Sequence, residues 1–125
     1  AADISRVEPL DSPDAQVSMR APLCGSTIQV ELCIKKGRVS RFGQNIKACA
    51  LGQAAASVLA AHVIGKSAED ILAVRDQVRD MLADKGPSPD GDWSALSALA
   101  PAKDAKSRHG AILLPFNAVL KAFAS

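Results

Sequence analysis

The sequence predicts an α+β fold in which a three-stranded antiparallel sheet is followed by helices packed on one face. Residues 27–34 alternate between apolar and polar side chains, which is the period of a half-buried strand. After Cys49 the composition changes to long Ala-, Leu- and Val-rich stretches at helical spacing. Strands therefore precede helices, which favours α+β over alternating βαβ units. With 125 residues and 48% hydrophobic residues, we expect a single domain over 1–125.

Three segments form the predicted sheet. Residues 15–20 alternate weakly, 27–34 alternate cleanly, and 38–47 follow a Lys-Lys-Gly turn as the partner strand. Apolar side chains on 27–34 share one face, and the opposite face carries Thr27, Gln29, Glu31 and Cys33. The parity of the apolar residues changes within 38–47, and we expect a β-bulge near Gly43 to reconcile it. The sheet should have one polar face.

Proline and acidic residues in 1–14 predict a loose N-terminal arm. The first helix is expected over 50–64, with Gly65 as its C-terminal cap. Ser67, followed three residues later by Asp70, predicts the start of a second helix.

The C-terminal third is interrupted by turn-forming residues. Gly and Pro residues in 86–91 predict a surface loop, and a short helix is expected over 93–99. The polar stretch 101–108 should break the chain again. Apolar residues in 109–124 recur at helical spacing, and Pro115 should start or kink that helix.

Composition excludes several classes of function. The net charge of +2 is too small for a strong phosphate-binding field, and three Phe with one Trp offer few stacking surfaces for nucleic acid. No apolar stretch is long enough to span a bilayer, and no secretory leader is apparent. An odd number of cysteines without a leader predicts free thiols or thiolate ligands in a reducing compartment, the bacterial cytoplasm or the mitochondrial matrix.

Five residues are candidates for chemistry. Cys24 lies between Pro and Gly residues, in a loop suited to presenting a thiol or simply holding a small apolar side chain. Cys49 is expected at a helix N-terminus, where unpaired N–H groups favour the thiolate that binds metal or attacks sulfur. Cys33 is interpreted as a packing residue on the polar face of a strand, and His62 as a helix contact. His109 opens the last helix beside the basic run Lys103, Lys106 and Arg108, which either docks an acidic partner or is a solvated face.

As an ordered set, four motifs make the chain resemble the NifU/IscU-type iron–sulfur cluster assembly scaffolds. The family's Pro-x-Cys-Gly-Asp motif corresponds to 22–26, and its Cys before a small-residue helix corresponds to 48–57. A Gly-Lys helix start matches 65–70, and the region of the family's third Cys matches 108–116. The resemblance runs from about residue 22 to 123.

The resemblance implies a ligand set at which two family positions differ. Ser26 stands where the family has Asp, and Gly110 stands where it has its third Cys. When the family's ligand positions are carried over to this sequence, the metal ligands are Cys24, Cys49 and His109, with Ser26 as a weak ligand. Cys33 matches no ligand position of the family and is a possible auxiliary ligand. Such a set would hold a [2Fe–2S] cluster with an added ligand, or Zn²⁺, or no metal if the site is degenerate.

Three functions follow from the resemblance. The first is a non-enzymatic scaffold that holds iron, an iron–sulfur cluster or zinc and passes it to acceptor proteins. The second is an accessory subunit of a larger complex, for example a respiratory one. The third is a sulfur acceptor for a cysteine desulfurase. The expected partners are a desulfurase, a cluster acceptor or a host complex, without nucleic acid or membrane insertion.

Overall fold

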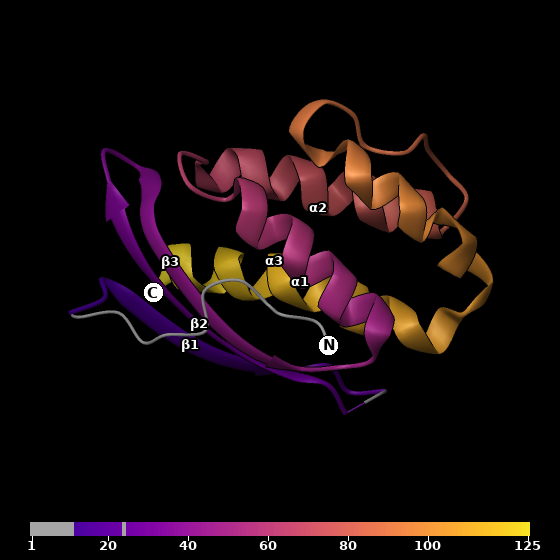
Figure 1. Ribbon diagram of the computed structural model, residues 1–125, viewed down its shortest axis with the longest axis horizontal. Helices are drawn as coiled ribbons and strands as arrows, with labels where there is room; N and C mark the ends of the chain where they lie inside the picture. Colours follow the sequence, from indigo (N-terminus) through magenta and orange to yellow (C-terminus); the bar gives the residue numbers. More distant parts are fainter. Residues whose placement is uncertain (1–11, 24) are drawn as a thin grey trace.

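The computed structural model describes residues 12–23 and 25–125, which form an antiparallel sheet covered on one face by helices (Figure 1). The sheet has the order β1 (Ala15–Arg20), β2 (Thr27–Lys35), β3 (Arg38–Lys47). The helical part follows in the chain order α1 (Ala50–His62), α2 (Ala68–Leu82), η1 (Gly91–Asp104), η2 (Lys106–Arg108) and α3 (His109–Ala124), where η marks a 3₁₀ helix. The predicted α+β arrangement is confirmed.

The core lies between the sheet and α3. Helix α3 packs on β1 and β2, while α1 lies against β3 and α2 packs on α3. The alternating apolar residues of the strands face this core and are buried: Val17, Ile28, Val30, Leu32, Phe42 and Ile46. β1 and β2 bury alternate side chains over most of their length, so the opposite face of these strands carries mostly polar residues, as the alternation predicts.

The β-bulge lies at Ser40 and not near Gly43, so its predicted position is wrong. The register passes from Cys33↔Arg41 to Ile34↔Val39, which leaves Ser40 as the extra residue. Val39 and Phe42 are both buried although three positions separate them, so the change of parity must occur between them. Gly43 pairs regularly with Glu31.

Asp14 satisfies the backbone at this bulge. Its Oδ2 accepts a hydrogen bond of 2.7 Å from the N–H of Ile34, the residue at which the register shifts. Residues 1–11 of the predicted N-terminal arm lie outside the described residues. Residues 12–14 contact the end of β2, so the last part of that arm is anchored to the sheet.

Helices α1, α2 and α3 begin where the sequence predicts. Helix α1 ends at His62, slightly before the predicted end, and Gly65 follows with a φ of +87°. Helix α2 is opened by a capping box in which Ser67 Oγ accepts from the N–H of Asp70 and Asp70 Oδ2 accepts from the N–H of Ser67. Pro115 lies inside α3 and is buried.

The segment after the 86–90 loop differs from the expected short helix and polar break. A 3₁₀ helix, η1, runs through Pro101 to Asp104. Its buried residues recur every third position: Trp93, Leu96, Leu99 and Ala102. A 3₁₀ helix has three residues per turn, so this spacing places all four on one face. No helix among the described residues is long and apolar enough to cross a membrane.

Candidate functional site

Three chain segments meet at one end of the sheet: the β1–β2 loop, the β3–α1 junction and the start of α3 (Figure 1). A Cβ built on Gly110, in the first turn of α3, lies 3.5 Å from the Cβ of Ala21 in the loop. A Cβ built on Gly52, in the first turn of α1, lies 3.2 Å from the Cβ of Ala111. The first turns of α1 and α3 are therefore in direct contact, and the loop lies against α3.

The β1–β2 loop is closed by backbone hydrogen bonds at its ends. The N–H of Ala21 donates to the carbonyl of Ser26 at 2.8 Å, and the N–H of Gly25 donates to the carbonyl of Ala21 at 3.0 Å. Gly25 has a φ of +72°, a conformation that glycine adopts without steric cost. Cys24, a predicted ligand, lies outside the described residues. Ser26, predicted as a weak ligand, is buried beneath the loop.

Cys49 is the N-cap residue of α1, as the sequence predicts. Its carbonyl accepts the N–H of Gln53 at 3.0 Å, and its side chain makes no capping hydrogen bond. Gln53 also donates from Nε2 to the carbonyl of Ala48 at 3.0 Å, which braces the same turn. The thiol of Cys49 is free and partly exposed, at the positive end of the helix dipole.

His109 is held in one tautomer by the end of η1. Its Nε2 lies 2.9 Å from the carbonyl oxygen of Ala102. Because a carbonyl oxygen can only accept, Nε2 is the donor in this contact, and in the neutral form of the ring the lone pair is then on Nδ1. A ligand histidine commonly donates its second N–H to a carbonyl in this way, so the arrangement suits metal binding through Nδ1.

The surroundings of His109 differ from those of Cys49. His109 lines a hollow of about 400 Å³ together with residues at the end of α2 and around η2, and Cys49 is not among the described residues that line it. No group of three or more His, Cys, Asp or Glu side chains in the described part of the chain could hold a metal ion. A tetrahedral site needs four donors, so Cys49 and His109 do not suffice without further ligands.

Cys33, the predicted auxiliary ligand, lies near the other end of β2. Its Sγ is 3.9 Å from the carbonyl oxygen of Ser12, which it faces as a donor. Cys33 is six positions along the strand from Thr27 at the loop end, and at about 3.3 Å per residue this is roughly 20 Å. The structure therefore does not bring Cys33 together with the loop end of the sheet.

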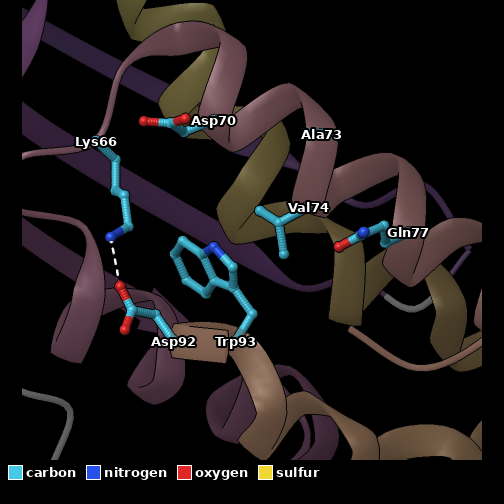
Figure 2. A pocket seen from close by; sticks show the side chains of 7 residues that line it. All are labelled: Lys66, Asp70, Ala73, Val74, Gln77, Asp92 and Trp93. Atoms are coloured by element: carbon cyan, nitrogen blue, oxygen red, sulfur yellow. Dashed lines mark hydrogen bonds and ion pairs between the residues drawn. The ribbon is translucent and has the colours of Figure 1, made fainter. Parts of the chain in front are cut away.

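A separate hollow of about 290 Å³ lies between α2 and the start of η1 (Figure 2). Lys66 Nζ donates to Asp92 Oδ2 at 2.7 Å and lies 5.8 Å from the ring centroid of Trp93. This hydrogen bond holds the pKa of Asp92 below its ordinary value. His62 contacts Trp93 edge-on at 5.9 Å, which agrees with its interpretation as a helix contact. Neither Cys49 nor His109 lines this hollow, so it is distinct from the candidate site.

The profile of the NifU-like N-terminal domain family matches residues 5–107. The chain belongs to this family. The crystal structure of the N-terminal part of a nitrogen-fixing NifU-like protein from Brucella abortus is 40% identical, with a TM-score of 0.93 over 98% of this chain and 85% of that one. Comparison with curated proteins found no match.

Two more distant structures share the fold. A hypothetical protein is 23% identical, with a TM-score of 0.86 over 99% of this chain and 93% of that one. A protein of Fervidobacterium islandicum, described as a candidate iron–sulfur cluster assembly scaffold for the SUF system, is 15% identical. Its TM-score is 0.84 over 95% of this chain and 87% of that one. The NifU-like fold is thus retained at low identity.

Gly52 is a positioning residue of this NifU-like chain that the sequence analysis did not single out. A Cβ at this position would lie 2.9 Å from the Cβ of Ala48 and 3.1 Å from the carbonyl oxygen of Ala111. Only glycine allows the first turns of α1 and α3 to approach this closely. A lone glycine in an otherwise Ala-rich helix was the available signal.

Proposed function

We propose that this chain is an iron–sulfur cluster assembly scaffold that holds its metal cargo at Cys24, Cys49 and His109. The family to which it belongs, whose members are generally non-catalytic scaffolds, carries this proposal. The cargo is a [2Fe–2S] cluster or its iron and sulfide, with Zn²⁺ as the alternative ion. The chain binds and releases this cargo and performs no turnover of its own.

The sulfur and nitrogen donor atoms of the proposed site favour soft and borderline metal ions. Cys49 offers a free thiol at a helix N-terminus, and His109 offers the Nδ1 lone pair of a fixed tautomer. Cys24 directly follows Leu23 in the sequence, and Leu23 is exposed. Two thiolates and one imidazole leave one position for an added ligand from solvent, a small thiol or a partner protein. An incompletely liganded cluster is also one that can be handed to an acceptor.

The departures at Ser26 and Gly110 favour a second function, that of an accessory subunit in a larger complex. Gly110 provides no donor atom at the position where the family has its third cysteine thiol. The side chain of Ser26, at the position of the family's Asp, is buried. A third function, sulfur acceptance from a cysteine desulfurase, would use the free thiol of Cys49.

The test is the metal and acid-labile sulfide content of protein purified without oxygen, together with its visible spectrum. We expect iron and sulfide in equal amounts, lost in Cys24→Ser, Cys49→Ser and His109→Gln. Gln places an amide nitrogen near the former Nε2, so it preserves the hydrogen bond to Ala102 while removing the metal-binding lone pair. Cys33→Ser is the matched control and should retain the cargo.

The other outcomes discriminate among the three functions. Zinc without sulfide, lost in the same variants, would establish a metal carrier and reject cluster assembly. Absence of metal in every preparation would reject the carrier role and favour the accessory subunit. A mass increase of one sulfur atom on Cys49, after incubation with a desulfurase and cysteine, would support sulfur acceptance.

A further inference from the structure

The segments that meet at the loop end of the molecule carry cations and no acidic side chains of their own. The segments 20–27, 44–53 and 105–112 contain Arg20, Lys47, Lys106 and Arg108 and no Asp or Glu, although the chain has 13 acidic residues. All four side chains are exposed. Within the described part of the chain, the ion pairs involve other residues, and none of these four takes part in one. These four cations therefore make no ion pair with the described residues, although Asp84 and Asp104 line the same hollow as Lys106.

The four cations surround the β1–β2 loop from two sides. Arg20 on β1 pairs with Thr27 on β2, and Thr27 pairs with Lys47 on β3, so the two cations lie on the same face of the sheet, two strand spacings or about 10 Å apart. Lys106 and Arg108 directly precede the first turn of α3, where Gly110 meets the loop. The loop thus lies between a basic sheet edge and a basic helix start.

Leu23 belongs to the β1–β2 loop and is the most exposed large apolar side chain of the described residues. Its exposed fraction is 82%, against 54% for Ile64 and 43% for Leu72. Leu23 lies between loop ends that the Ala21–Ser26 and Gly25–Ala21 hydrogen bonds hold together. An apolar side chain within a polar rim is the usual anatomy of a protein interface.

The charge pattern favours an acidic protein surface over a nucleic acid or a lipid bilayer. Four cations at one end of a chain of net charge +2 are few for a phosphate backbone. A single leucine is also a weak membrane anchor. Unpaired cations, two of which lie about one Debye length apart, instead steer and orient a protein of opposite charge.

We propose that the basic rim, formed by Arg20, Lys47, Lys106 and Arg108, docks the acidic face of a protein partner, with Leu23 seated in an apolar depression of that partner. This inference rests on the proposed function and deepens it, because the rim encircles the loop of the proposed cargo site. The partner that receives or supplies the cargo is then recognised by acidic residues placed around an apolar contact.

Binding to a folded plant-type [2Fe–2S] ferredoxin, a small and strongly acidic protein, tests the proposal by surface plasmon resonance at several salt concentrations. The charge reversal Arg20→Glu with Lys47→Glu should lower the association rate about tenfold or more at low salt. Leu23→Ser should raise the dissociation rate about tenfold. Leu23 is largely exposed, so its substitution should leave the fold intact.

Matched controls make the same types of substitution at positions away from the basic rim. Lys35→Glu with Arg41→Glu reverses one Lys and one Arg at the opposite end of the sheet and should leave the association rate unchanged after correction for net charge. Leu72→Ser on α2 should leave the dissociation rate unchanged. Three results would each overturn the proposal. The control and rim charge reversals could change the association rate equally, Leu23→Ser could leave the dissociation rate unaltered, or the wild type could fail to bind. Tighter, Leu23-independent binding to heparin or anionic vesicles would overturn it in favour of a polyanion.

Cargo uptake is measured separately on the same variants. The rim variants should take up iron and sulfide as the wild type does, since none of them removes a proposed ligand. Loss of docking with normal uptake supports the proposal. If the chain binds the acidic protein normally but takes up no metal, the proposed interface is supported and the proposed scaffold function is rejected.

Discussion

Replacing Gly52 by alanine should destabilise the protein although it places a better helix former in α1. The added Cβ would lie 2.9 Å from the Cβ of Ala48, 3.1 Å from the carbonyl oxygen of Ala111 and 3.2 Å from its Cβ. Contacts below 3.0 Å between carbon atoms are strongly repulsive, and neither neighbour can rotate away. The first turns of α1 and α3 must therefore separate.

The magnitude is the difference between two opposing effects. Overpacking a well-filled contact costs about 1–3 kcal/mol. Replacing a helical glycine by alanine gains about 0.5–1 kcal/mol. The net loss should be about 1–2 kcal/mol, which lowers Tm by roughly 4–8 °C for a chain of this size.

Gly110→Ala provides the matched control in the same contact region. Its added Cβ would meet the Cβ of Ala21 at 3.5 Å, which is ordinary van der Waals contact. Only the gain in helix propensity remains, so stability should be unchanged or rise by up to about 1 kcal/mol. Urea unfolding followed by circular dichroism measures both variants, and the difference between them cancels most of the propensity effect.

The outcome also bears on the candidate site, because Ala48 precedes Cys49 directly. A Gly52→Ala variant should bind less metal than Gly110→Ala under identical anaerobic conditions. Equal unfolding free energies for the two variants would refute the inferred close approach of α1 and α3.

Four further outcomes are expected. Gly110→Cys should increase the iron and sulfide content over wild type, whereas Gly110→Ser should not, because position 110 accommodates a side chain and only the thiol adds a soft donor. Ser67→Ala should cost about 1 kcal/mol in thermal unfolding, through loss of the α2 cap. The hydrogen bond from the N–H of Ser67 holds the pKa of Asp70 below 3.8, so the Asp70 carboxylate stabilises the folded state above that pH. The loss of stability in Asp70→Asn should therefore disappear as the pH falls through the lowered pKa. A loss of stability that stays constant down to about pH 2 would contradict this. Lys66→Met should lower the unfolding free energy by roughly 0.5–1 kcal/mol and shift the fluorescence of Trp93; an unchanged spectrum would argue against the contact.

Much of the local structure could be predicted because it depends on residues close together in the sequence. Strict alternation places the start of β2, the Lys-Lys-Gly turn places the start of β3, and the apolar period places α3. Ser67 and Asp70 identify the start of α2 through hydrogen bonds that span only three residues. The placement of Cys49 at the N-terminus of α1 follows from the change in composition beside it.

Elements whose form depends on distant partners could not be predicted in the same way. The bulge at Ser40 reflects the pairing of β3 with β2 and the need of Val39 and Phe42 to face one core. The 3₁₀ helix η1 follows from burial of every third residue against α1 and α2, which overrides the breaking tendency of Pro101.

The sequence by itself determined the fold class, the candidate thiols and the two family positions at which the ligand set departs. The tertiary structure alone decided that Gly52 meets Ala111, that Gly110 meets the β1–β2 loop, and that Cys33 lies at the far end of its strand. It also fixed the tautomer of His109 through the carbonyl of Ala102. The physical reason is that residue type and spacing encode local backbone preference, whereas the distances between donors arise from packing among segments far apart in the chain.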